Sequence, residues 1–198
     1  MTQDGTGLTT QPKLRLIRGG RDGLALGPLR LTVAPADAPP FEVAATVREE
    51  DTWLVLSADP TVTTPTDSVM QIMTELLKAE PLALGSVAVG RGTPLPLLAV
   101  VYDLGEEPLC RPEWIESALR EIFALVEQRQ FATLAMPLLG VRHGRIPMER
   151  FAALLAQVIR ETSFAHLRRI WLVTPETQVG QIRRLLAGMN GEPQATSE

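Results

Sequence analysis

Cysteine and histidine are scarce in this chain of 198 residues, which has one cysteine, Cys110, and two histidines. A single cysteine excludes an internal disulfide and is typical of a reducing compartment, so we expect a cytoplasmic protein. Transition metals are held mainly by cysteine and histidine, and we therefore expect no metal site. The sequence also lacks a Gly-x-Gly-x-x-Gly, a Walker or a Gly-x-Ser-x-Gly motif, and no cofactor is expected.

Long apolar runs and an excess of positive charge are missing as well. No segment approaches the roughly 18 consecutive apolar residues of a membrane span, and residues 1–13 lack the basic and then apolar pattern of a signal peptide. We therefore expect no membrane partner. The formal net charge of −4 argues against a dedicated nucleic-acid surface, which is normally basic.

The composition is that of one globular domain. With 45% hydrophobic residues, the chain is long enough to bury a full core. We expect a single domain over residues 13–189, of which about 13–50 form an N-terminal extension. Residues 1–12 and 190–198 are polar and are expected to be flexible tails.

Strand and helix patterns alternate along most of this domain. Such alternation predicts an α/β fold, in which three layers (α/β/α) surround a mixed, mostly parallel central sheet. Helices are expected to begin near Thr66, at Pro112, at Pro147 and near Val179. The expected strands are Leu29–Val33, Phe41–Val47, Trp53–Leu56, Ser86–Val89, Leu97–Tyr102, Ala132–Met136 and Arg169–Val173.

The stretch Leu134–Pro147 is the strongest candidate for a ligand site. It runs from an apolar strand through Gly140 and Gly144 to a proline at the start of an amphipathic helix. Unpaired N–H groups at a helix N-terminus stabilise anions, and the guanidinium of an arginine such as Arg142 binds phosphate in a bidentate manner. An ordinary strand-to-helix turn remains the alternative interpretation.

This stretch resembles the second ligand loop of macro domains, where a strand ending in proline leads to a glycine-rich loop and a proline at the next helix. The matching positions are Pro137, Leu138, Leu139, Gly140, Gly144 and Pro147, and the similarity extends over roughly Trp53–Leu186. The resemblance implies ADP-ribose or a related phosphate-bearing nucleotide as the partner. The implied ligand-binding residues are Asp59, Leu138, Leu139, Gly140, Val141, Arg142, His143, Gly144 and Arg145.

The first ligand loop of the family departs from its usual sequence here. Where the family has Asn-Ala-Ala-Asn and then glycines, this chain has Leu56-Ser-Ala-Asp59 followed by residues 60–69 without a glycine. Strong catalysis is therefore not expected. An acidic residue near the adenine is implied on the early strands, and Asp37 is the candidate.

Two alternatives to a binding module remain open. The chain could be a non-binding scaffold in protein assembly, with a protein partner. It could also be a hydrolase of ADP-ribosyl or O-acetyl-ADP-ribose esters, in which Asp59 acts as general base and His143 as acid or polarising group. Cys110 is interpreted as an inert packing residue, because no histidine is paired with it.

Overall fold

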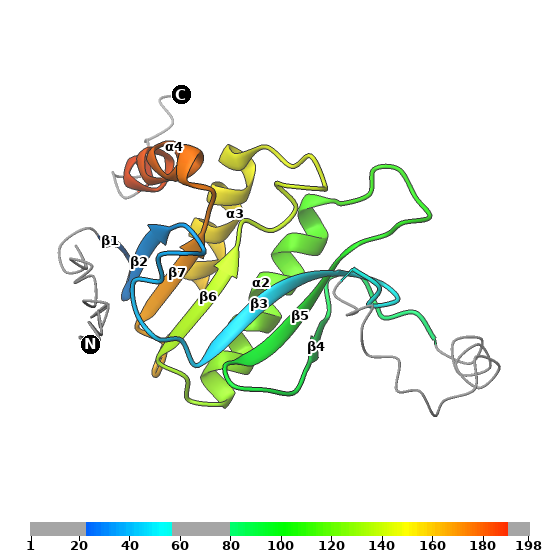
Figure 1. Ribbon diagram of the computed structural model, residues 1–198, viewed down its shortest axis with the longest axis horizontal. Coiled ribbons are helices and arrows are strands. Elements are labelled where there is room, and N and C mark those ends of the chain that lie inside the picture. Colours follow the sequence, from blue (N-terminus) through cyan, green and yellow to red (C-terminus); the bar gives the residue numbers. More distant parts are fainter. Residues whose placement is uncertain (1–22, 57–79, 190–198) are drawn as a thin grey trace, which may run out of the picture.

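The computed structural model describes residues 23–56 and 80–189 (Figure 1). In these ranges the strands form one seven-stranded sheet in the order β1-β2-β7-β6-β3-β5-β4. The predicted tails at 1–12 and 190–198, the helix near Thr66, and Asp59 lie outside the described residues. The strands are β1 Leu24–Leu26, β2 Leu29–Ala34, β3 Ala45–Asp51, β4 Val87–Val89, β5 Leu95–Tyr102, β6 Thr133–Pro137 and β7 Arg169–Val173; the helices are α2 Pro112–Gln128, α3 Met148–Glu161 and α4 Glu176–Gly188.

The sheet is mixed and mostly parallel, which confirms the predicted fold class. Strands β2, β7, β6, β3 and β5 pair in parallel, while β1 and β4 add antiparallel edges. Helices α2 and α3 pack against each other behind the sheet, and α4 packs against α3, β1 and β2 (Figure 1). None of the helices in the described ranges is both long and apolar enough to cross a membrane.

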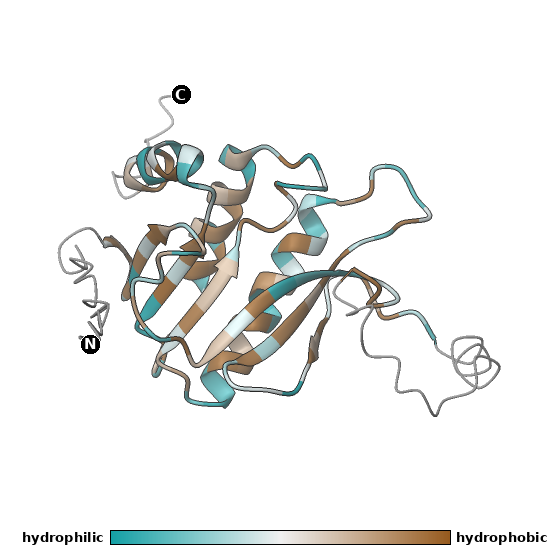
Figure 2. Cartoon of the chain, in the orientation of Figure 1, coloured by the Kyte–Doolittle hydropathy of each residue, from teal (hydrophilic) through white to brown (hydrophobic). Residues whose placement is uncertain are grey.

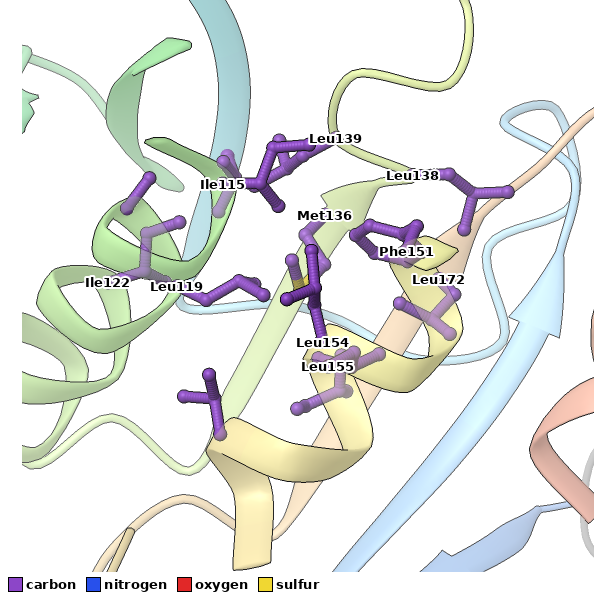
Figure 3. Close-up of a cluster of buried hydrophobic side chains, with 14 of the residues drawn as sticks. Ile115, Leu119, Ile122, Met136, Leu138, Leu139, Phe151, Leu154, Leu155 and Leu172 are labelled. Atoms are coloured by element: carbon purple, nitrogen blue, oxygen red, sulfur yellow. The ribbon is translucent and has the colours of Figure 1, made fainter. Parts of the chain in front are cut away.

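The helices begin where the sequence indicates. Pro112 occupies the first turn of α2, where its missing N–H has no helical partner to lose. Pro147 directly precedes α3. Both helices turn one apolar face towards the sheet, and this face forms the centre of the hydrophobic core (Figure 3). Its fully buried members include Ile115, Leu119, Ile122, Met136, Leu139, Phe151, Leu155 and Leu172.

The predicted strand at Trp53–Leu56 is wrong, because the chain turns there instead. The side chain of the buried Asp51 accepts hydrogen bonds from the backbone N–H groups of Trp53 at 2.7 Å, Val55 at 3.0 Å and Leu56 at 3.1 Å. An aspartate that bonds to the backbone that follows it competes with strand pairing and closes a turn. The strand lies earlier, in β3.

Strand β3 separates from its neighbour β6 halfway along the sheet. It pairs with β5 over its whole length, but with β6 only at Ala45 and Thr46. Figure 1 shows its carboxyl half bending away from β6, and Figure 2 shows this half as hydrophilic beside the apolar β5. The gap between the two parallel strands therefore opens at their carboxyl ends, the edge where α/β proteins usually bind ligands.

Candidate functional site

A cleft of about 670 Å³ lies at this carboxyl edge, a size typical of small-molecule sites. It is bordered by β3, by the loops that follow β2, β6 and β7, and by the first turn of α4. Its lining residues are Ala36, Glu49, Pro137, Leu138, Val141, Arg142, His143, Val173, Thr174, Pro175 and Gln178.

The cleft is largely apolar on one side, apart from Thr174 and Gln178, and carries its charged side chains on the other. Ala36, Val173 and Pro175 come from the ends of β2 and β7, which are neighbours in the sheet. Glu49 and the loop residues Arg142 and His143 come from the side of β3 and β6. Such an arrangement suits an amphipathic ligand with an apolar ring at one end and polar or charged groups at the other.

The loop of residues 138–146 is held by its own backbone. The N–H of Val141 donates to the carbonyl of Leu138, and the N–H of Ile146 donates to the carbonyl of Gly140, both at 3.1 Å. Gly140 has a φ of +74°, in the left-handed region that glycine adopts readily. The loop is therefore a closed turn with a defined shape.

The two glycines of this loop are required by packing against Cys110. A Cβ at Gly144 would lie 2.4 Å from the Cβ of Cys110, and one at Gly140 would lie 2.6 Å from Ile115 Cδ1 and 2.9 Å from Cys110 Sγ. Both positions thus lie too close to buried side chains to hold a larger residue. This packing is enough to explain why both positions are glycine, with no role for a ligand. It agrees with the interpretation of this stretch as an ordinary strand-to-helix turn.

A carboxylate from β3 lies against this loop. Glu49 Oε1 accepts a hydrogen bond from the N–H of Gly140 at 2.6 Å and another from the hydroxyl of Tyr102 at 2.9 Å. The ring of Tyr102 in turn contacts the ring of His143 edge to face, with centroids 6.2 Å apart. Three elements that are far apart in the sequence thus meet at one carboxylate.

The groups around Glu49 have shifted pKa values. Burial raises the pKa of Glu49, although the bonds from Gly140 and Tyr102 and the positive charge of the loop oppose this effect. The pKa of Tyr102 is raised by burial and then by the charge of Glu49. Burial and the same charge raise the pKa of Cys110 to about 12. The cysteine is thus a protonated packing residue rather than a nucleophile.

The structure separates the predicted site residues into distinct environments. Leu138 lines the cleft together with Val141, Arg142 and His143. Leu139 is fully buried, and Figure 3 shows it on the side of α2, so only its backbone could touch a ligand. Arg145 is exposed and has a φ of 55° at the end of the loop.

Two further residues, Asp59 and Asp37, were predicted for the site. Asp59, one of the two catalytic candidates, falls outside the described residues. Asp37 is exposed, and its neighbour Ala36 lines the cleft. In residues 23–56 and 80–189, no group of three or more His, Cys, Asp and Glu side chains could hold a metal ion.

Sequence reasoning missed the residues that β3, β5 and α4 contribute. The predicted strand ended at Val47, although the alternation of Ala45, Thr46 and Val47 continues to Glu49 and places its side chain on the same face as those of Ala45 and Val47. Tyr102 was assigned to a buried strand, which is correct, but its hydroxyl contact could not be read from periodicity. Gln178 follows β7 by five residues and reaches the cleft from the first turn of α4.

Comparisons with known proteins agree with this architecture. No protein-family model and no curated protein matches the sequence. The fold is similar to that of a mutant of the Oceanobacillus iheyensis macrodomain with ADPR, with 15% identity and a TM-score of 0.63 over 85% of this chain and 97% of that one. It is also similar to the Trypanosoma brucei macrodomain in complex with ADP, with 12% identity and a TM-score of 0.55 over 80% of this chain and 68% of that one. The macro domain of ganglioside induced differentiation associated protein 2 shares 13% identity at a TM-score of 0.56, over 79% of this chain and 82% of that one. The chain therefore has the macrodomain fold.

Proposed function

We propose that this protein is a nucleotide-binding module whose ligand is ADP-ribose or a related phosphate-bearing nucleotide. The observation that carries the proposal is the cleft of about 670 Å³ at the carboxyl edge of the sheet, with Arg142 and His143 on its wall. Its apolar side suits a base, and its charged side suits ribose and phosphate. Macrodomain structures with ADPR and with ADP support the same class of ligand.

Arg142 is the residue that we expect to bind the phosphate. It is exposed at the centre of the loop and lines the cleft, and its guanidinium is always charged and forms paired bonds to phosphate oxygens. Because the backbone of the loop is held by its own hydrogen bonds, this side chain can bind without reordering the loop.

Isothermal titration of the full chain with ADP-ribose tests this function, with AMP and inorganic phosphate as comparison ligands. We expect a dissociation constant in the micromolar range for ADP-ribose, which corresponds to about −8 kcal/mol. Arg142→Glu should weaken binding by about tenfold or more, since it replaces an attractive charge by a repulsive one. Arg150→Glu is the control, because Arg150 is exposed on α3 and does not line the cleft.

The outcomes separate the candidate functions. No heat from ADP-ribose with correctly folded protein would refute the binding proposal and favour a scaffold in protein assembly. Equal affinities of the wild type and Arg142→Glu would show that the loop is not the phosphate site.

Hydrolysis is the second candidate, because the cleft places His143 beside a carboxyl with a raised pKa, that of Glu49. Groups with shifted pKa values in a cleft are candidates for acid–base chemistry. A time course with O-acetyl-ADP-ribose and with an ADP-ribosylated protein tests it. If neither substrate is turned over, the protein is not this kind of hydrolase.

A further inference from the structure

A carboxylate of the chain itself, that of Glu49, lies on the charged side of the cleft. Glu49 Oε1 accepts the N–H of Gly140 at 2.6 Å, at the point where the loop leaves β6. Glu49 also lines the cleft. The backbone N–H that opens this loop is therefore capable of binding an anion, and a carboxylate from β3 occupies it.

The position of this carboxylate follows from the sheet. Since β3 pairs with β6 only at Ala45 and Thr46, its later residues have β5 on one side and the gap on the other. The hydroxyl of Tyr102 on β5 holds the same oxygen at 2.9 Å. Within residues 23–56 and 80–189, both hydrogen bonds to this carboxylate end on Oε1. Among these residues no donor reaches Oε2, which can therefore accept one from a ligand.

We infer that Glu49 determines the ligand specificity of the cleft: its carboxylate excludes a phosphate from the N–H of Gly140 and accepts a hydroxyl or amino group of the ligand in its place. The inference rests on the proposed nucleotide-binding function and narrows it. Two anions cannot share one N–H, and a phosphate beside an ionised carboxylate is repelled. The favoured ligands therefore present a sugar hydroxyl or an amino group to this wall, with any phosphate placed elsewhere along the cleft.

Glu49→Gln tests the inference because it removes the charge and keeps the size of the side chain. The neutral amide oxygen can still accept the bonds from Gly140 and Tyr102, so the fold should persist. It accepts them more weakly than a carboxylate does and does not repel an anion, so a phosphate can displace it from the N–H of Gly140. Glu176→Gln is the matched control: Glu176 is an exposed carboxylate on the first turn of α4, next to the lining residue Pro175.

The measured quantity is the ratio of the affinities for ADP-ribose and for adenosine, by isothermal titration of the full chain. We expect Glu49→Gln to raise this ratio by about tenfold or more, because the phosphates gain a site while the uncharged adenosine gains none. Glu176→Gln should leave the ratio unchanged. A ratio that is the same in the wild type and Glu49→Gln overturns the inference, while the binding function would still stand.

A second measurement keeps the inference testable if neither nucleotide binds. The amide signal of Gly140 is followed by NMR while inorganic pyrophosphate is added at constant pH and ionic strength. We expect the signal to move in Glu49→Gln and to stay in place in the wild type. If it moves equally in both proteins, or in neither, Glu49 does not exclude an anion from this N–H and the inference fails.

Discussion

Replacing Glu49 by glutamine should make the only tyrosine of this chain easier to ionise. Tyr102 is 1% exposed, and its hydroxyl donates to Glu49 at 2.9 Å. Burial, and then the negative charge of Glu49, raise the pKa of this phenol. Two unit charges about 4 Å apart interact by about 4 kcal/mol at an effective dielectric constant of about 20. Because Glu49 is only half-buried, we expect the substitution to lower the free energy of ionisation by about 2–3 kcal/mol.

The assay uses the fact that the sequence contains one tyrosine. An alkaline titration followed by the ultraviolet absorbance of phenolate reports on Tyr102 alone, while far-ultraviolet circular dichroism reports whether the protein is still folded. In the wild type, phenolate should form only as the fold is lost. In Glu49→Gln it should form at a lower pH, yet still above the ordinary value of about 10, since burial remains.

Two results would refute this reasoning. If the wild type formed phenolate near the ordinary pKa while still folded, Tyr102 would not be buried beside a charge. If both proteins ionised at the same pH, the carboxylate would not act on the phenol. Glu176→Gln again serves as the control, and its titration should match that of the wild type.

Three further predictions concern the supports of the cleft. Gly144→Ala should destabilise the protein by about 2–4 kcal/mol in urea denaturation, because its Cβ would lie 2.4 Å from that of Cys110; Gly180→Ala, where nothing lies within 4 Å, should be neutral or stabilising, and equal effects would contradict the packing. The Cys110 thiol, whose pKa burial raises to about 12, should react with a disulfide reagent only as the protein unfolds, and rapid labelling of the native state would show that it is accessible. Glu127→Ala should cost about 1–3 kcal/mol near neutral pH, since this carboxylate accepts three backbone N–H groups of residues 165–167. Although burial opposes it, these bonds lower the pKa of Glu127, so its contribution is present above the unfolded pKa and lost as the pH falls through the folded one; a difference from the wild type that persists in strong acid would contradict this.

The sequence predicted the elements whose apolar residues repeat with a clear period. Helix α2 was expected to begin at Pro112, and the structure confirms this start. Strand β7 likewise runs from Arg169 to Val173 as expected. In both elements the burial of one face or of the whole strand determines the structure, and burial is what the spacing of apolar residues encodes.

Only the first half of strand β3 was predicted, within Phe41–Val47, because its second half is charged. Its second half is Arg48-Glu-Glu-Asp51, a composition that indicates a loop when it is read alone. Pairing with β5 keeps these residues in the sheet, and such pairing depends on a segment more than 40 positions away. The error left Glu49, which lines the cleft, outside the predicted site.

The position of the loop of residues 138–146 was predicted correctly, but the packing reason for its two glycines was not. Periodicity shows that Gly140 and Gly144 follow a strand, and this pattern is common to a phosphate loop and to an ordinary turn. Only the distances to Cys110 and Ile115 show that the side chains behind the loop demand glycine. Whether a loop binds a ligand therefore has to be judged from the groups in front of it.

The closed backbone of residues 138–146 determines how a ligand would be bound. Since Gly140 and Ile146 are already joined by a hydrogen bond, binding would require no folding of this segment, and its conformational entropy is lost when the protein folds. The conformational entropy that binding would still cost belongs to exposed side chains such as Arg142. Ordering such a side chain costs on the order of 1–2 kcal/mol. Substitutions at this position would thus alter the affinity and leave the shape of the loop unchanged, so the cleft could change its ligand one side chain at a time.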